Sequence, residues 1–302
     1  MKKPELLLPA GTLDRLKTAF LYGADAVYAG MPTVSLRNKT SFTLEEMKEG
    51  IEFAHQKQKK VYLTMNLFTH NRDIENLKTF VNNLNFLRPD GVIIADPGVF
   101  GYVKENCPWL PLHISTQANV CSSLTVDFWH KQGASLVVLG RETPLEEIKE
   151  IRKQCPDIKL EMFIHGALCI SYSGRCLLSN FMTGRSANKG NCAHSCRWKY
   201  KLYIEEENRP NEFMEITEDT HGTYIMNSKD LCLIDRLNDI LPIGIDSFKI
   251  EGRNKSEYYT AITAHTYRHA IDSWFKNPQE WSADIFNGMN EHNFLCLHFD
   301  LS

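Results

Sequence analysis

The feature that most constrains the fold of this chain is a regular alternation of short apolar segments with longer amphipathic ones. Seven runs rich in β-branched and other apolar residues follow one another up to residue 166, and each ends at glycine, asparagine or another polar residue. The stretches between them carry apolar residues at helical spacing. Strands and helices that alternate in this way predict a parallel sheet with helices packed against its faces.

An eighth apolar run comes late in the chain. The predicted strands lie at 5–11, 25–30, 60–66, 91–97, 110–119, 135–142, 159–166 and 246–253. Eight strands in this rhythm favour an α/β fold of the (β/α)8 TIM-like barrel type over an open sheet. We expect the barrel to be irregular where the rhythm is interrupted.

Threonines mark the starts of several predicted helices. We expect helices over 12–23, 43–58 and 143–154, and a long helix over 256–275. Thr12, Thr43 and Thr143 stand at N-cap positions, where a side-chain oxygen can accept a hydrogen bond from the first turn. Thr43 and Thr143 are each followed three residues later by a glutamate, which predicts a capping box at both helix starts.

The strand–helix rhythm breaks once, after the seventh predicted strand. The interruption holds a cysteine-rich loop and then, over 199–230, a stretch typical of antiparallel strands around polar turns. Loops that follow barrel strands build the C-terminal face of the barrel, where active sites lie. We therefore expect a barrel domain over 1–282 that carries a functional insertion over 167–246, and an unmatched tail over 283–302.

The overall balance of residues is that of a soluble globular protein. Net charge is −3 and 43% of the residues are hydrophobic, which argues against a protein that coats nucleic acid or membrane surfaces along its whole length. The apolar stretch near the N-terminus is too short for a signal peptide, and no run approaches the length of a membrane span. We expect a cytoplasmic protein, without a membrane partner, whose cysteines stay reduced.

Five of the nine cysteines fall within 64 residues: Cys169, Cys176, Cys192, Cys196 and Cys232. Zinc sites usually draw their ligands from closely spaced pairs, and here only the C-x3-C pair is close. Thiols spread over separate loops suit a larger object, such as an iron–sulfur cluster held by four thiolates. The alternative is that these are buried core cysteines, which is the interpretation we adopt for Cys107, Cys121, Cys155 and Cys296.

The charge around these cysteines is one-sided. From Met162 to Ile204 there are six lysines and arginines and no acidic residue. Cations favour the thiolate form that binds metal, and they offset the negative charge of a thiolate-bound cluster. Over 185–201 the basic residues alternate with Trp198 and Tyr200, so this stretch suits phosphate contacts and base stacking. A solvated basic loop with one buried tryptophan is the alternative.

The cysteine loop carries a pattern of fixed positions: Glu161, Phe163, Gly166, Ala167, Leu168, Cys169, Gly174, Cys176, Leu178 and Ser179. With this pattern the loop resembles the collagenase-like peptidase family U32, a family of unassigned mechanism. The stretches GNCAHSCRWKY (190–200), GTYIMNSKDLCLI (222–234) and FKIEGR (248–253) also resemble that family, and are most similar to its tRNA 5-hydroxyuridine modification branch. The resemblance covers roughly residues 4–281.

This resemblance implies a function that differs from the family's name. It implies oxygen-independent hydroxylation of the wobble uridine of tRNA, with prephenate as the small-molecule hydroxyl donor. Sister branches imply hydroxylation of ribosomal RNA or of a ubiquinone precursor. It also implies a 4Fe-4S cluster on Cys169, Cys176, Cys192 and Cys232, with Cys196 as an alternative ligand. Members of the tRNA branch usually continue into a further C-terminal domain, so we expect a partner protein or such a domain to help hold tRNA.

Polar residues at the ends of the predicted strands are the candidates for substrate chemistry. Arginines bind carboxylates in a bidentate way, so Arg141 and Arg253 suit the two carboxylates of prephenate, and His165 or Glu251 could move a proton. Each of these residues could equally satisfy loop backbone groups. The candidate catalytic residues are His165, Glu251 and Arg253, and the candidate substrate-binding residues are Asn66, Gln117, Asn119, Arg141, Lys249, Arg197 and Trp198.

Two further functions compete with RNA hydroxylation. A protease could use Cys169 as nucleophile and His165 as base, although the sequence lacks the HExxH and GxSxG motifs of common hydrolases. A thiolate bound to metal is not available to attack a peptide, so the protease and the cluster require the same cysteines for different tasks. The third hypothesis is a non-enzymatic scaffold in which the cluster is structural.

Overall fold

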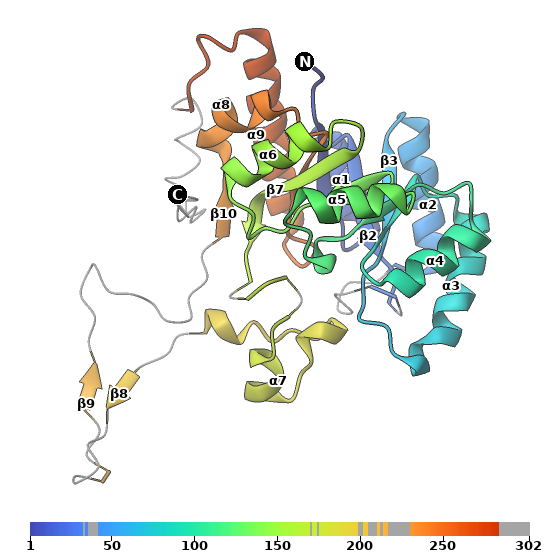
Figure 1. Ribbon diagram of the computed structural model, residues 1–302, viewed down its shortest axis with the longest axis vertical. Helices are drawn as coiled ribbons and strands as arrows, with labels where there is room; N and C mark the ends of the chain where they lie inside the picture. Colours follow the sequence, from blue (N-terminus) through green and yellow to red (C-terminus); the bar gives the residue numbers. More distant parts are fainter. Residues whose placement is uncertain are drawn as a thin grey trace.

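The structure, a computed structural model, is a closed barrel of eight parallel strands surrounded by helices (Figure 1). It describes residues 1–32, 34–35, 42–169, 171–173, 175–198, 202–204, 210–211, 214–216 and 230–283. The strand order β7-β11-β1-β2-β3-β4-β5-β6 is closed by pairing of β6 with β7. The predicted TIM-like barrel is therefore confirmed.

All eight predicted strands are barrel strands, and the structure makes several of them shorter than the sequence suggested. The largest difference is at 110–119, where the strand ends at Ile114 and a 3-10 turn from Thr116 to Ala118 follows. The barrel strands are β1 (Glu5–Pro9), β2 (Ala26–Gly30), β3 (Lys60–Met65), β4 (Gly91–Ile94), β5 (Leu112–Ile114), β6 (Leu136–Val138), β7 (Lys159–Ala167) and β11 (Ser247–Ile250).

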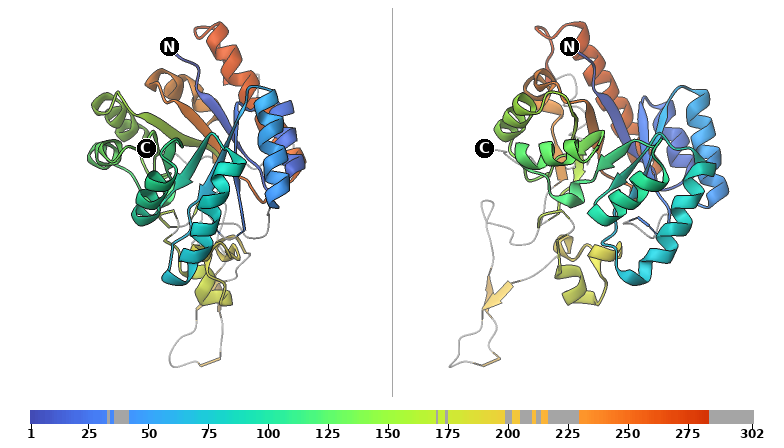
Figure 2. Two further views of the ribbon diagram at one scale, coloured as in Figure 1. Left: turned by 90° about the vertical axis from the view of Figure 1, so that its right-hand side faces the viewer. Right: turned by 45° about the vertical axis from the view of Figure 1, so that its right-hand side comes forward.

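Helices follow most of the strands and cover the outside of the barrel (Figures 1 and 2). Two predicted N-caps are confirmed, at Thr12 and at Thr43, where Glu46 completes the capping box. The barrel helices are α1 (Leu13–Leu21), α2 (Leu44–Gln56), α3 (Ile74–Leu87), α4 (Pro97–Asn106), α5 (Ser123–Lys131), α6 (Leu145–Gln154), α8 (Leu237–Ile240) and α9 (Glu257–Lys276).

The predicted capping box at Thr143 is wrong. Helix α6 begins at Leu145, so that Pro144 takes the N-cap position and supplies no side-chain hydrogen bond. The Thr143 side chain is buried, and its Oγ1 atom has no hydrogen-bond partner in the described part of the chain. A proline is tolerated at a helix start because its missing N–H would have no intrahelical partner there.

The main hydrophobic core lies between the outer face of the barrel and the helices, and a smaller apolar cluster lies inside the barrel. Beside this inner cluster, Lys249 Nζ lies 2.7 Å from Glu161 Oε1, and both side chains are almost fully buried. Burial lowers the pKa of Lys249, while the Glu161 carboxylate opposes that shift. The barrel interior therefore holds a buried ion pair that depends on both partners.

His113, on β5, lies toward the opposite end of the barrel interior from the strand ends that carry the candidate site. Its ring packs against Tyr62, with 4.6 Å between ring centroids. Burial, and then the charge of Lys249, lower the pKa of His113 to about 3. The imidazole is thus neutral at physiological pH.

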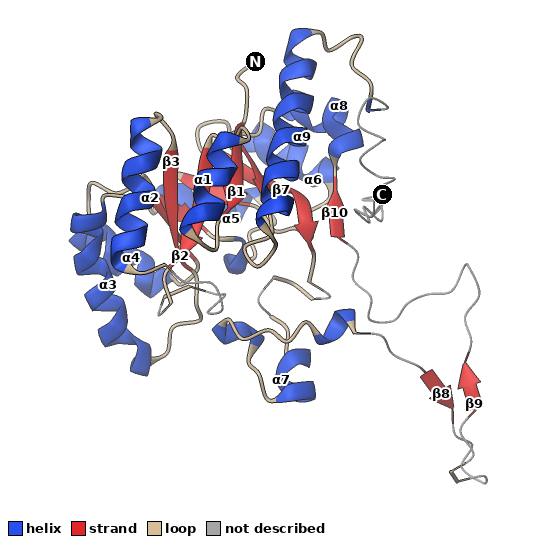
Figure 3. Ribbon diagram, turned by 180° about the vertical axis from the view of Figure 1, so that it is seen from behind, coloured by secondary structure: helices blue, strands red, loops and turns tan. Residues whose placement is uncertain are grey.

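The predicted insertion begins at the end of β7. It contains helix α7 (Leu178–Thr183), which lies beyond the C-terminal ends of the barrel strands (Figures 1 and 3). The predicted antiparallel strands are confirmed as β8 (Leu202–Ile204) paired with β9 (Met214–Ile216). Strand β10 (Asp230–Cys232) then returns antiparallel to the end of β7. Most of the proposed tail over 283–302 is outside the described residues.

One glycine shows how tightly this end of the barrel is packed. Gly166 has a φ of +107°, in the region that favours glycine, and a Cβ there would clash with the carbonyl oxygen of Glu251. The close approach sets the end of β7 beside the segment that follows β11. Within the described ranges, no helix is both long and apolar enough to cross a membrane.

Candidate functional site

A pocket opens at the C-terminal ends of the barrel strands. The inner end of the pocket lies inside the barrel, where it is lined by Tyr28, Phe163 and Lys249. Its outer wall is formed by the loops, including the one that carries the cysteines. Of the eight polar residues that the sequence placed at strand ends, the pocket is lined by Asn66, Gln117, Arg141, Lys249, Glu251 and Arg253. The barrel fold therefore brings together residues that are up to 187 positions apart in sequence.

Arg141 follows β6, and its guanidinium lies over the aromatic ring of Phe163. The centre of the guanidinium is 4.0 Å from the centroid of Phe163, a distance that permits a cation–π interaction. The Nε atom of Arg141 and the Oε1 atom of Gln117 are both buried, and neither has a hydrogen-bond partner among the residues that the structure describes. Buried polar atoms normally have partners, so these two atoms provide hydrogen-bonding capacity for a ligand.

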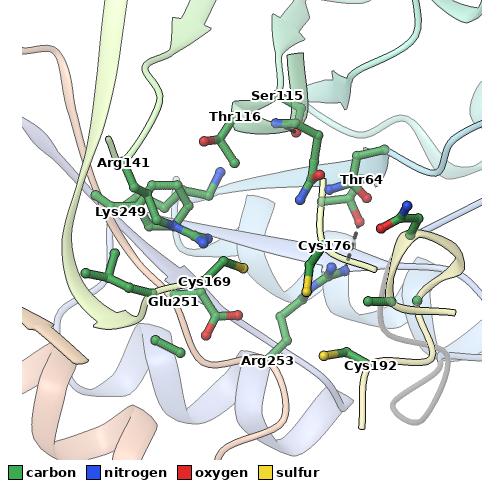
Figure 4. A pocket seen from close by; sticks show the side chains of 18 of the residues that line it. Thr64, Ser115, Thr116, Arg141, Cys169, Cys176, Cys192, Lys249, Glu251 and Arg253 are labelled. Carbon is green, nitrogen blue, oxygen red and sulfur yellow. Dashed lines mark hydrogen bonds between the residues drawn. The ribbon is translucent and has the colours of Figure 1, made fainter. Parts of the chain in front are cut away.

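Arg253 is held in place on the other side of the pocket. Its Nη1 atom donates hydrogen bonds to Ser35 Oγ at 2.6 Å and to Thr64 Oγ1 at 3.0 Å. The side chain is 6% exposed, and Glu251 beside it is 7% exposed. Figure 4 shows both residues on the same side of the pocket as the labelled thiols. Cations surround the pocket, so an anionic group would bind favourably in it.

Four of the five clustered cysteines line this pocket: Cys169, Cys176, Cys192 and Cys196. The first of these is exposed and the other three are partly buried. Cys192 Sγ accepts a hydrogen bond from the backbone N–H of His194 at 3.4 Å, and such N–H donors stabilise thiolates that hold metal clusters. Figure 4 shows Cys169, Cys176 and Cys192 among the residues that line the same pocket as Arg253.

The positions of the cysteine thiols can be compared with the coordination geometry that a metal site requires. A single zinc ion requires its sulfur ligands at about 2.3 Å from one point. In the part of the chain that the structure describes, no three Cys, His, Asp or Glu side chains are grouped closely enough for one ion. Four thiols line one pocket together with arginine and lysine side chains, and a backbone N–H donates to one sulfur; these are the residue types that a thiolate-bound cluster requires.

The segment that carries these cysteines, 167–198, is attached to the barrel by a few polar contacts. We call it the cysteine segment. Glu142 Oε1 accepts hydrogen bonds from the backbone N–H of Ser173 at 2.8 Å and from its hydroxyl. Asn119 donates to the carbonyl oxygen of Ser173 at 3.2 Å and accepts from Arg175 Nε at 3.0 Å. These contacts hold the loop between Cys169 and Cys176 against the barrel.

Two ion pairs attach the later part of the cysteine segment. Lys189 Nζ lies 2.6 Å from Asp73 Oδ2, and the same ammonium group donates to the carbonyl oxygen of Phe68. The hydrogen bond from Lys189 lowers the pKa of Asp73. Arg197 Nη1 lies 2.8 Å from Asp230 Oδ1, which connects the segment to β10. Arg197 also lines the pocket.

Four of the predicted site residues are not among those that line the pocket. Asn119 supports the cysteine loop instead, as described above. His165 lies beneath α9, where its Nδ1 atom is 3.3 Å from the hydroxyl of Tyr267. Cys232 is buried, with its sulfur 3.8 Å from that same hydroxyl. Trp198 is 46% exposed.

Sequence reasoning missed several residues that shape the site. Glu142 directly follows Arg141 at the end of a predicted strand, and that position was a signal that it faces the mouth of the barrel. Thr64 stands two positions before Asn66 in a predicted strand, so strand geometry puts its side chain on the same face of the strand as Asn66. Ser115 and Thr116 also line the pocket, but the predicted strand over 110–119 gave no indication that the chain turns there.

Comparison with known proteins gives a consistent assignment. The sequence model described as peptidase family U32 matches residues 11–295. The chain is 45% identical to tRNA hydroxylation protein P of Escherichia coli K12, over 90% of this chain and 68% of that protein. It is 34% identical to the 23S rRNA 5-hydroxycytidine C2501 synthase of the same organism, over 96% of this chain and 42% of that protein.

The fold has a relative among solved structures. The structure of the U32 peptidase Mk0906 aligns with a TM-score of 0.54 at 15% identity, covering 84% of this chain and 94% of that one. At this identity the likeness shows the fold alone. The chain spans about two thirds of the length of the tRNA hydroxylation protein that it matches. The family model and the sequence identity together show that the chain belongs to peptidase family U32.

Proposed function

We propose that this protein takes part in hydroxylation of a tRNA nucleoside, with the wobble uridine converted to 5-hydroxyuridine. The observation that supports this most directly is a cation-lined pocket whose outer wall carries four thiols, in a chain 45% identical to a protein named for tRNA hydroxylation. The proposal places the reaction in the cytoplasm. It leaves 23S ribosomal RNA as the second candidate substrate, because the chain is also related to an rRNA hydroxycytidine synthase.

The proposed cofactor is a 4Fe-4S cluster at the outer wall of the pocket. Cys169, Cys176 and Cys192 would supply three ligands, and the fourth would be Cys232 or Cys196. The pocket-lining position of Cys196 supports that residue, whereas the family resemblance supports Cys232. When bound, such a cluster supplies one-electron transfer or a Lewis-acidic iron.

The proposed hydroxyl donor is prephenate, held inside the pocket. Arg141 and Arg253 would bind its carboxylates, since a guanidinium can donate two parallel hydrogen bonds to a carboxylate. Arg253 is already held by Ser35 and Thr64, so little side-chain freedom remains to be lost on binding. Hydroxylation balances without dioxygen if the donor's C–O bond and the C5–H bond of uracil both break, the hydroxyl bonds to C5, and the donor carbon takes up the hydrogen. The donor is then reduced by the two electrons that the base loses.

The residues that line the pocket also distinguish between the two candidate proton carriers and weaken the peptidase alternative. Glu251 lines the pocket and is the better placed of the two candidate proton carriers, because His165 packs under α9 between Tyr259 and Tyr267. For the same reason His165 is poorly placed to activate Cys169 as a protease nucleophile. Among the described residues no hydrogen bond joins that histidine to a cysteine of the segment.

The test is nucleoside mass spectrometry of tRNA from a strain that lacks the gene. We expect 5-hydroxyuridine derivatives to disappear, to return with the wild-type gene and with the control Cys155→Ala, and to remain absent with Cys169→Ala. Unchanged tRNA in the deletion strain would refute the proposed substrate. Full restoration by Cys169→Ala would remove the cluster from the reaction.

A separate measurement tests the cofactor and its ligands. Protein purified without oxygen should contain iron and sulfide and should absorb broadly at about 400 nm, as thiolate-bound clusters do. Comparing iron content in Cys196→Ser and Cys232→Ser assigns the fourth ligand, since only the ligand variant should lose iron. Zinc in place of iron in the wild-type protein would contradict the proposed cluster.

A further inference from the structure

The cysteine segment exposes large apolar side chains beside the pocket. Phe181, on α7, is 85% exposed, Leu177 is 69% exposed and Trp198 is 46% exposed. Leu177 and Phe181 are four residues apart and so share one face of the helix. Helix α7 packs against the 3-10 turn Ser195–Arg197, which directly precedes Trp198. Figures 1 and 3 show α7 beyond the strand ends, apart from the helices that cover the outside of the barrel.

The charge of this surface indicates the kind of partner. No acidic residue occurs between Met162 and Ile204. Arg175 and Arg185, one on each side of α7 in the sequence, use their guanidinium groups on neutral acceptors, the side chain of Asn119 and the carbonyl oxygen of Cys192. In the described residues neither arginine forms an ion pair with a carboxylate. Two cations without a carboxylate partner among the described residues, on the same segment as the exposed aromatic rings, fit a polyanion better than an apolar protein surface.

We propose that Phe181, Trp198 and the neighbouring Leu177 form a stacking platform for unpaired RNA nucleotides next to the pocket, with Arg175 and Arg185 contacting phosphates. This rests on the proposed function and extends it, because it assigns the surface that holds the loop around the modified nucleotide. Aromatic side chains bind unpaired bases by stacking, which a paired duplex does not permit at its base faces. The platform would hold neighbouring bases while one nucleotide enters the pocket.

The chain supplies matched variants for a test. Phe181→Ala removes the ring, Phe181→Tyr keeps a ring, and Phe181→Leu keeps an apolar side chain without a ring. Phe128, on α5, is also an exposed aromatic residue, 51% exposed, and it packs against Trp129 on the outside of the barrel. Phe128→Ala therefore serves as a control for the loss of an exposed ring outside the cysteine segment.

The measurement is binding of the full-length, anaerobically purified protein to two RNA probes, a hairpin with an unpaired loop and a blunt duplex of the same stem. We expect Phe181→Ala to weaken hairpin binding about tenfold, the usual effect of losing one stacked base. Phe181→Leu should lose a similar factor, while Phe181→Tyr and Phe128→Ala should match the wild type. Duplex binding should be the same in all of these proteins.

Three outcomes would overturn the platform. Wild-type hairpin affinity in Phe181→Ala would do so while leaving the proposed function intact. Wild-type hairpin affinity in Phe181→Leu would show that an apolar side chain without a ring is sufficient, so that position 181 does not act by stacking on a base. Failure of the wild-type protein to bind either probe, together with unchanged tRNA nucleosides in the deletion strain, would remove both this inference and the proposed function.

Discussion

The barrel wall and the cysteine segment differ in the interactions that hold them in place. In the wall, large apolar side chains such as Leu6, Leu8 and Phe248 are fully buried, and each strand is hydrogen-bonded to two neighbours. In the cysteine segment, Leu177 and Phe181 are mostly exposed, and hydrogen bonds and ion pairs such as those of Ser173 and Lys189 attach the chain to the barrel. The wall derives its stability from buried apolar area, whereas the segment derives its position from single hydrogen bonds and ion pairs.

Because of this difference, we expect the barrel interior to determine global stability and the cysteine segment to determine cofactor and RNA binding. A substitution in the barrel interior should change the free energy of unfolding, because it disturbs a closely packed region with no alternative arrangement. A substitution in the cysteine segment should leave that free energy nearly unchanged and should alter local order, cofactor retention or RNA binding. Three predictions test this contrast, in order of decreasing effect on global stability.

The largest effect is expected at the ion pair inside the barrel. Glu161→Ala leaves the ammonium group of Lys249 buried without its counter-charge, and the Ser247 hydroxyl loses an acceptor as well. Removing one member of a buried pair costs roughly 3–5 kcal/mol. Urea denaturation should therefore show a large drop in the free energy of unfolding.

The matched control is the surface pair of Lys17 and Glu49, which has the same 2.7 Å separation but an exposed carboxylate. Glu49→Ala should cost less than about 1 kcal/mol, as exposed pairs do. The double variant Glu161→Leu, Lys249→Met should recover much of the loss, since apolar side chains of similar size can replace a buried pair. Equal costs for Glu161→Ala and Glu49→Ala would contradict the contrast between interior and surface.

The second prediction concerns pH and the neutral imidazole of His113. Its pKa falls from 6.5 to about 3 on folding, so between these pH values the unfolded chain binds a proton that the folded chain does not. Stability therefore decreases as the pH falls from about 6.5 toward 3, by about 1.4 kcal/mol per pH unit from this group. Denaturation at several pH values should show a shallower decrease in His113→Phe than in the wild type.

The exposed residue His130 on α5 provides the comparison. His130→Gln replaces a side chain on the surface of α5 and serves as the control for the loss of a histidine outside the barrel interior. A His113→Phe variant with the same pH profile as the wild type would show that His113 is protonated, or reaches water, in the folded protein.

The two regions also differ in how far they could be predicted from sequence. Barrel strands are specified by local pattern, and each of the eight apolar runs became a strand of the barrel. Errors arose where the pattern is locally ambiguous. Thr143 is followed by both a proline and a glutamate, so the sequence suits a cap at Thr143 and an equally good helix start one residue later, which the structure adopts.

Positions at the mouth of the barrel were predictable because parallel strands end on the same side. That reasoning placed Arg141, Lys249 and Arg253 at one mouth of the barrel, and all three line the pocket there. It could not separate side chains that face the pocket from those that support a loop, as Asn119 does, or that pack under a helix, as His165 does. That distinction depends on bulges and turns, such as the register shift next to Ile250, which no residue pattern specifies.

The smallest effect on global stability, with the clearest local consequence, is expected at Glu142. Its carboxylate accepts two hydrogen bonds from the fully buried Ser173, so Glu142→Ala releases the loop between Cys169 and Cys176 from one of its anchors. A hydrogen bond of this kind contributes about 1 kcal/mol or somewhat more. Because the barrel core is untouched, global unfolding should change by no more than about that amount.

Hydrogen exchange measures the local effect directly. In Glu142→Ala the amides around Ser173 should exchange about tenfold faster, since local opening is the lowest-energy route to exchange there, while amides of β1 and β2 keep their wild-type rates. Glu146→Ala, which removes an exposed carboxylate from α6, should alter neither. If the amides near Ser173 keep wild-type protection in Glu142→Ala, the loop is held by the contacts of Asn119 instead, and Asn119→Ala should then produce the faster exchange. Faster exchange in the barrel strands as well would mean that the wall and the cysteine segment unfold as one unit, and the separation of stability from function would fail.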